Sequence, residues 1–133
     1  MTSMGVPLQE PTFLILTALA GGPLHGYGVI QEVTRLSGGR VVLRPGTLYG
    51  ALDRLAEERL LESDREEMVD GRLRRYYRLT DEGAAVLEQE AARLQGNADA
   101  ARRRLARRPP HRAMVPGVVP RPGVVPRPAG GLA

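Results

Sequence analysis

Residues 45–59 read PGTLYGALDRLAEER, and the interpretation of the rest of the chain depends on this stretch. Its apolar residues Leu48, Ala51, Leu52 and Leu55 recur at the three- and four-residue spacing of one buried helix face. A proline suits the start of a helix, because the first turn does not use the N–H that proline lacks. The acids come late in the stretch. The sequence therefore predicts a helix that ends near Arg59, with no negative charge on its early turns.

Two more helices are predicted on the N-terminal side of this stretch. An apolar run at 13–20 follows Pro11 and fits a helix that is buried nearly all round. Residues 26–36 carry apolar side chains on one face and polar ones elsewhere, as expected of an amphipathic helix. Residues 41–43 read VVL, a short β-prone run between the second and third helices.

A two-stranded hairpin is predicted on the C-terminal side. Residues 60–68 and 73–79 flank Asp70-Gly71, a dipeptide that favours the positive-φ turn of a β-hairpin. Alternation along the second strand separates two faces. One face holds Leu73, Arg75, Tyr77 and Leu79, and the other holds Arg74, Tyr76 and Arg78. Thr80 is placed to cap a following helix.

Residues 80–108 carry the strongest periodic pattern, and we expect them to form one C-terminal dimerisation helix. Its apolar residues alternate spacings of four and three, the rhythm of a helix that packs along a partner helix. They are Leu87, Ala91, Leu94, Ala98, Ala101 and Leu105, called the seam below. Packing on its own domain is the alternative. We favour a dimer contact, because a helix of roughly 25 residues spans about 38 Å and extends beyond so small a body.

The charge is divided unevenly along the chain of 133 residues, whose net charge is +4. Residues 1–100 contain 11 arginines and all 15 carboxylates, a balance of −4, whereas residues 101–133 contain eight arginines and no acid. The cluster at 102–108 suits a helix C-terminus by its dipole and also fits a nonspecific attraction to DNA. From Pro109 onward the chain contains seven of its 11 prolines and repeats PGVVPR, which is typical of a disordered tail at 109–133.

The composition argues against catalysis and cofactors. The chain has no cysteine, no lysine and only two histidines, which excludes thiolate nucleophiles, cysteine-ligated zinc, a P-loop lysine and a Schiff base. His25 has no accompanying ligand at metal-binding spacing, so we expect no metal. The apolar run at 13–20 is too short to cross a bilayer, and no basic residue precedes Arg35 as a signal peptide would require. We therefore expect a cytoplasmic protein without enzyme activity or membrane contact.

Three helices followed by a hairpin is the order of a winged helix-turn-helix domain, a mainly α fold with an α+β wing. We expect it at 1–79, with a flexible arm at 1–10. In this fold the third helix enters the DNA major groove, and the hairpin, or wing, lies along the backbone or minor groove. The first turn of that helix offers unpaired N–H groups to phosphate, and Arg40 and Arg44 precede it. The carboxylates between Glu57 and Glu67 should face away from DNA. A protein-binding module on the same fold is the alternative and would show no salt-sensitive affinity for DNA.

Four motifs in one order resemble the PadR family of bacterial transcriptional regulators, over residues 8–95. They are GPLHGY at 22–27, PGTLY at 45–49, ALDRL at 51–55 and RRYYRLT at 74–80. The resemblance implies homodimeric winged-helix proteins, usually repressors. The two-fold axis of such a dimer would require an inverted-repeat operator with half-sites about one helical turn apart. The resemblance also implies a C-terminal helix that supports dimerisation, here a single one as in the short subfamily. Release from DNA in such proteins is often triggered by a small aromatic or drug-like effector.

Charge, position and resemblance together give the expected DNA-contacting residues. They are Tyr27, Arg44, Gly46, Thr47, Tyr49, Arg54, Arg72, Arg74, Arg75 and Tyr76. The sequence departs from the family pattern at Gly50, where a proline commonly follows the Thr-Leu-Tyr motif. It also contains no tryptophan, whereas some relatives hold aromatic effectors between tryptophans at the dimer interface.

Overall fold

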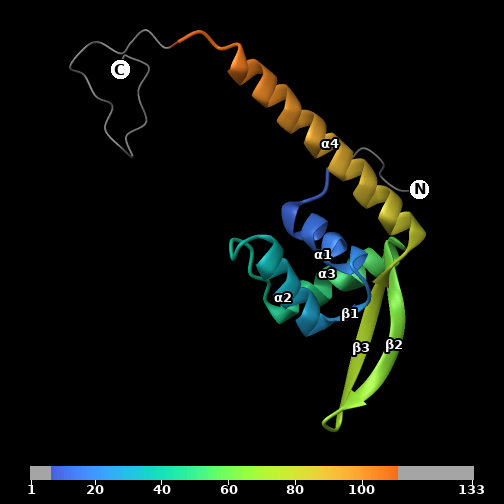
Figure 1. Ribbon diagram of the computed structural model, residues 1–133. Coiled ribbons are helices and arrows are strands. Elements are labelled where there is room, and N and C mark those ends of the chain that lie inside the picture. Colours follow the sequence, from blue (N-terminus) through green and yellow to red (C-terminus); the bar gives the residue numbers. More distant parts are fainter. Residues whose placement is uncertain (1–6, 111–133) are drawn as a thin grey trace, which may run out of the picture. The chain divides into compact units, whose positions relative to one another are not determined.

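The structure is a computed structural model that describes residues 7–110. Its elements follow in the order α1 (Glu10–Ala20), β1 (Leu24–His25), α2 (Gly26–Leu36), α3 (Pro45–Glu57), β2 (Leu61–Val69), β3 (Arg72–Leu79) and α4 (Asp81–Ala106) (Figure 1). The predicted order of three helices, a hairpin and a final helix is therefore confirmed. Residues 1–6 of the expected arm and 111–133 of the expected tail lie outside the described residues.

The chain divides into two compact units, Met1–Gly96 and Asn97–Ala133. The first unit contains the winged helix together with the first part of α4. Within the described residues, the second unit consists of the end of α4 and the short segment that follows it to Pro110. The division falls inside α4, so the beginning of this helix belongs to the winged-helix unit.

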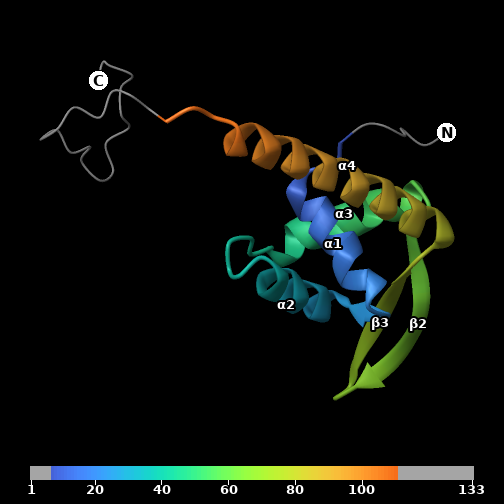
Figure 2. The same cartoon turned by 45° about the horizontal axis from the view of Figure 1, so that its top comes forward.

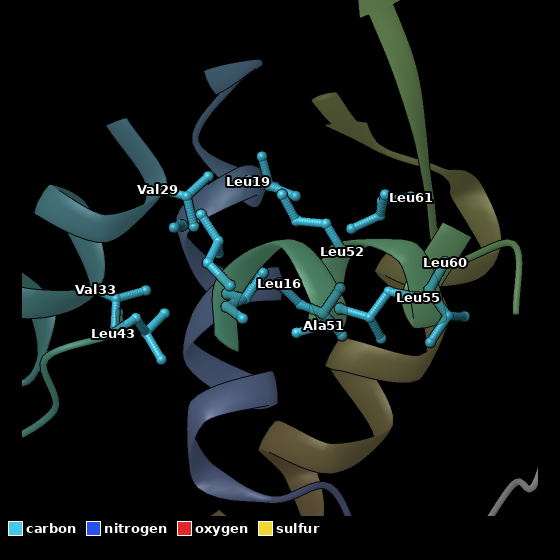
Figure 3. Close-up of a cluster of buried hydrophobic side chains, with 13 residues drawn as sticks. Leu16, Leu19, Val29, Val33, Leu43, Ala51, Leu52, Leu55, Leu60 and Leu61 are labelled. Carbon is cyan, nitrogen blue, oxygen red and sulfur yellow. The ribbon is translucent and has the colours of Figure 1, made fainter. Parts of the chain in front are cut away.

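The core of the first unit lies between α1, α2, α3 and the base of the hairpin (Figure 2). Helix α1 has no fully exposed side chain between Pro11 and Leu19, which agrees with the prediction of a helix buried nearly all round. On α3 the predicted face is buried, and Leu48, Leu52 and Leu55 are each at most 1% exposed (Figure 3). Burying a side chain of this size contributes about 1.5–3 kcal/mol, so this face holds α3 firmly on the core.

The sheet has the strand order β1-β3-β2, and all pairs are antiparallel. Val69 pairs with Arg72 across the two-residue turn that the sequence predicted. Asp70 and Gly71 have φ values of 52° and 77°, so both turn residues adopt the positive φ that a type I′ turn requires. The hairpin of β2 and β3 is thus closed by its own local sequence.

A bulge in β2 decides which residues face each other near the base of the hairpin. Glu66 pairs with Arg75 and Ser63 pairs with Tyr77, so β2 contains one residue more than β3 between these two pairs. Counted from the turn, the extra residue shifts by one residue the pairing of the part of β2 beyond the bulge, which includes Leu61. Leu61 consequently lies opposite Leu79 in the core.

The run VVL at 41–43 does not form a strand, although its residues are β-prone. Leu43 instead packs into the core, and the Val41 N–H donates to the Ser37 hydroxyl at 2.9 Å. The third strand is β1, whose Leu24 and His25 pair with β3 and occupy the edge of the sheet. Burial of Leu43 and this occupied edge explain why the β propensity of the run is not realised.

Helix α4 begins at the base of the wing. The Gly83 N–H donates to the Thr80 hydroxyl at 2.9 Å, so Thr80 is the cap that the sequence predicted. A Cβ on Gly83 would lie 2.0 Å from the Leu60 carbonyl oxygen, which makes glycine necessary at this close approach. Two turns further, the buried Glu90 carboxylate accepts the Leu8 N–H at 3.2 Å. The last part of the expected arm is therefore tied to α4.

Candidate nucleic-acid interface

The first turn of α3 is open to solvent and rich in unused donors. Arg44 precedes the helix without capping it through its side chain, and Pro45 occupies the first turn. The Leu48 N–H donates to the Arg44 carbonyl at 2.9 Å, whereas the N–H groups of Gly46 and Thr47 come before the first intrahelical bond. Arg44, Gly46 and Thr47 are all exposed. This turn can therefore donate hydrogen bonds to an anion from its backbone.

Tyr49 connects the exposed face of α3 to the start of α2. Its side chain is 46% exposed, and a Cβ built on Gly26 would lie 2.2 Å from its hydroxyl oxygen. The phenol therefore packs directly over the Gly26 backbone. Next to this glycine, Tyr27 is 62% exposed. Tyr49, an expected DNA contact, is thus packed on α2 with about half of its surface accessible.

The arginines near α3 differ in their surroundings. Arg44 and Arg54 are exposed, and neither forms an ion pair within residues 7–110. Arg40, which the sequence placed before α3, is paired with Glu10 at the start of α1. The charge of Arg40 is thus balanced by Glu10, whereas the charges of Arg44 and Arg54 are not balanced by an ion pair in the described residues.

The wing arginines fall into two groups. Arg75 pairs with Glu66 at 3.0 Å, and Arg78 pairs with Glu62 at 2.8 Å and with Asp64 at 3.1 Å. The hydrogen bonds that they donate to these carboxylates raise the pKa of both guanidinium groups. Arg72 and Arg74, in contrast, form no ion pair with any residue that the structure describes.

Tyr76 lies in a cluster on one face of the sheet. The Arg65 guanidinium lies 3.9 Å from the centre of the Tyr76 ring, the Tyr76 hydroxyl donates to Glu67 Oε1 at 3.0 Å, and the His25 ring lies 5.4 Å away.

Partial burial, and then the positive charge of Arg74, lower the pKa of His25, while the negative charge of Glu67 raises it. Within residues 7–110, no group of three or more ligating side chains could hold a metal.

The seam on α4 divides into a packed and an uncovered part. Leu87 packs against the core of its own unit. Ala91 and Ala101 are exposed, and Leu94 and Leu105 are 41% and 63% exposed. Ala98 is half-buried. Leu87 thus packs on its own domain, which was the alternative to a dimer contact. Most of the other seam residues remain accessible.

Sequence reasoning missed three contributors to this surface. Gly26 supports Tyr49, Glu90 ties Leu8 to α4, and the wing carboxylates neutralise Arg75 and Arg78. The alternation of acids in β2 with arginines in β3 was a signal for the last of these. It could not be converted into pairs without knowing the bulge between Ser63 and Glu66.

An exposed helix start beside a wing, on a three-helix core, defines a winged helix-turn-helix protein of the DNA-binding class. Residues 15–89 match the Transcriptional regulator PadR-like family, and the chain belongs to this family. Its members are transcription regulators and not enzymes. Among the described residues, no helix is both long and apolar enough to span a bilayer.

Individual relatives support this assignment. The chain is 46% identical over 91 residues to an uncharacterized 37.1 kDa protein in transposon TN4556 of Streptomyces fradiae, covering 66% of this chain and only 25% of that one. It is 43% identical over 81 residues to the transcriptional regulator Rv3488 of Mycobacterium tuberculosis, covering 61% of this chain and 72% of the relative. A PadR family transcription regulator from Clostridium difficile R20291 superposes with a TM-score of 0.61 at 25% identity, covering 73% and 99% of the two chains.

Proposed function

We propose that the protein is a homodimeric, sequence-specific repressor that acts on DNA in the cytoplasm. The observation that carries this proposal is the first turn of α3, where exposed backbone donors lie between Arg44 and Arg54, both without an ion pair in the described part of the chain. Such a turn suits phosphate, and the residues after it suit the base edges of a major groove.

The roles of the contacting residues follow from their exposure. Thr47 and Tyr49 are the candidates for base contact, with Tyr27 beside them on α2. We assign Arg44, Arg54 and the Gly46 N–H to phosphate contacts, because these three residues are exposed. These backbone contacts would fix orientation, and the base contacts would give sequence preference.

On the wing, Arg72 and Arg74 are the strongest candidates for phosphate contact. Arg75 and Tyr76 would first have to exchange existing partners, Glu66 and Glu67, for DNA. We assign them to the same contact as secondary members.

Dimerisation would proceed through the exposed part of the seam, from Ala91 to Leu105. A two-fold pair of winged helices requires an inverted-repeat operator, with half-sites about one helical turn of DNA apart. We further propose that a small aromatic or drug-like effector releases the dimer from DNA. Because the chain has no tryptophan, stacking of this effector would fall to tyrosine or phenylalanine.

Fluorescence anisotropy with the duplex upstream of the protein's own gene, against a scrambled duplex at two salt concentrations, tests DNA recognition. We expect tighter binding to the upstream duplex that weakens as salt rises. Sedimentation equilibrium of the same sample tests the dimer. Absence of DNA binding at low salt would overturn the proposal and favour a protein-binding module.

A further inference from the structure

The second unit contains another arginine-rich surface, which the winged-helix contacts do not use. Five exposed arginines lie at the end of α4 and just beyond it, namely Arg102, Arg103, Arg104, Arg107 and Arg108. None of the five forms an ion pair inside the region that the structure describes. Between Asn97 and Pro110 the sequence contains a single acid, Asp99. The described part of this unit is therefore strongly positive.

Helix geometry separates these arginines from the seam. At about 100° per residue, Arg103, Arg104 and Arg107 lie on one face around Ala100, and we call these three arginines the basic face. The seam residues Leu94 and Leu105 lie roughly a third of a turn away. The seam residue Ala101 lies between the two, so a dimer contact along the seam would leave the three arginines of the basic face accessible.

A shallow surface hollow lies at the basic face. It is lined by Ala100, Ala101, Arg103, Arg104 and Arg107. The lining therefore combines three arginines with two small alanine side chains. Guanidinium groups bind phosphate through paired N–H donors, so this arrangement suits a row of phosphates better than an apolar partner.

The charge of the winged-helix unit indicates that these phosphates belong to DNA. Residues 1–96, which form this unit, contain 11 arginines and 14 carboxylates, a balance of −3, and the wing arginines Arg75 and Arg78 are already paired with acids. Electrostatic affinity for DNA grows with the number of phosphates that a protein neutralises. Because the winged-helix unit has a net negative charge, additional cations are needed to bind DNA, and the basic face supplies them.

We propose that the basic face binds the sugar-phosphate backbone of duplex DNA as a second, sequence-independent contact. This inference rests on the DNA binding proposed above and extends it to the C-terminal unit. The helix dipole also stabilises arginines in the last turn of a helix. That effect fades within one turn, whereas the cluster continues past Ala106, where α4 ends.

The test compares the full-length protein with the triple variant Arg103→Gln/Arg104→Gln/Arg107→Gln. Anisotropy titrations over a salt series give the slope of log K against log salt, on the upstream and scrambled duplexes. We expect the triple variant to flatten the slope by about 1 per arginine for each bound protomer, and to weaken binding to both duplexes by the same factor. The ratio of the two affinities should stay constant, because phosphate contacts carry no sequence information.

The matched control is Arg103→Lys/Arg104→Lys/Arg107→Lys, which keeps the charge and should keep the slope. Circular dichroism checks that both variants remain helical. A wild-type slope in the Gln variant, while the wild type binds DNA, would overturn this inference alone. Absence of DNA binding by the wild type would overturn the proposed function as well. Loss of binding to phosphatidylserine vesicles with an unchanged DNA slope would overturn the inference in favour of an anionic membrane.

Discussion

The wing and the end of α4 are both rich in arginine, but their side chains have different neighbours. On the wing, β2 supplies acids opposite the arginines of β3, and Arg75 and Arg78 are paired with them. At the end of α4, Arg103, Arg104 and Arg107 have no acid partner among the described residues. The number of arginines therefore does not measure the charge that a surface offers to DNA.

The difference has a simple structural origin. A hairpin places every residue of one strand beside a residue of the other, so acids in β2 meet arginines in β3. A single helix pairs charges only at three- and four-residue spacing. In α4 this spacing joins Glu90 to Arg93, and only one further acid, Asp99, stands against the five arginines between Arg102 and Arg108. Local partners thus decide which arginines remain for a ligand.

The largest effect is expected where α4 meets the base of the wing. Gly83→Ala would place a Cβ 2.0 Å from the Leu60 carbonyl oxygen. We expect a loss of about 3 kcal/mol in the free energy of unfolding, because rigid backbone must move. Urea denaturation measures it. Gly96→Ala on the same helix has nothing within 4 Å and should stabilise by up to about 1 kcal/mol. Equal stability of the two variants would contradict the close approach at Gly83.

The second prediction separates the two groups of wing arginines. Arg74→Ala should weaken binding to every duplex and flatten the salt slope by about 1, because this arginine has no acid partner in the described chain. Arg78→Ala should change the slope less, since Glu62 and Asp64 already hold that side chain. Salt-series anisotropy on one scrambled duplex compares them. The same slope change in both variants would show that ion pairing on the wing does not control phosphate contact.

A substitution at a base-contacting residue should change the sequence preference, whereas the arginine substitutions change the salt slope. Thr47→Ala should alter the preference between duplexes by on the order of 1 kcal/mol, since this exposed side chain lies on the early turns of α3. The salt slope should stay unchanged, because no charge is removed. Competition binding with a randomised half-site measures the preference. If the order of preferred sequences is unaltered, Thr47 does not contact bases.

The smallest effect concerns Glu90, which forms an ion pair with Arg93 in α4. Hydrogen bonds from Arg93, and then from the Leu8 N–H, hold the pKa of Glu90 below its ordinary value of 4.5 against the effect of burial. A lowered folded-state pKa gives stability that is complete above the unfolded value and disappears as the pH falls through the folded one. The Tm of the wild type should therefore fall more steeply below pH 4.5 than that of Glu90→Gln.

Glu88→Gln is the matched control for this pH dependence. Glu88 is exposed on the same helix and forms no ion pair within residues 7–110. Its variant should follow the wild-type pH profile of Tm. If Glu90→Gln follows that profile too, the charge of Glu90 does not contribute to stability through its contacts with Arg93 and Leu8.

Much of the fold could be predicted from short segments. The bounds of α2, the buried face of α3, the Asp70-Gly71 turn and the Thr80 cap each depend on residues close in sequence. The VVL run at 41–43 was misleading, because its residues favour a strand but Leu43 is buried in the core. A strand forms only where the edge of another strand is free to pair with it. The β propensity of residues 41–43 cannot indicate that β1 already pairs with the edge of β3.

The sequence by itself determined the winged-helix order, the exposed first turn of α3 and the concentration of arginine in two regions. These properties follow from periodicity, turn chemistry and composition, which are local. Only the tertiary structure decided that Tyr49 lies over Gly26, that Leu8 reaches Glu90 and that the bulge in β2 brings Glu62 opposite Arg78. These contacts depend on the register between distant segments. A one-residue shift in a strand exchanges its two faces, so the available charge of the wing is a property of the folded chain.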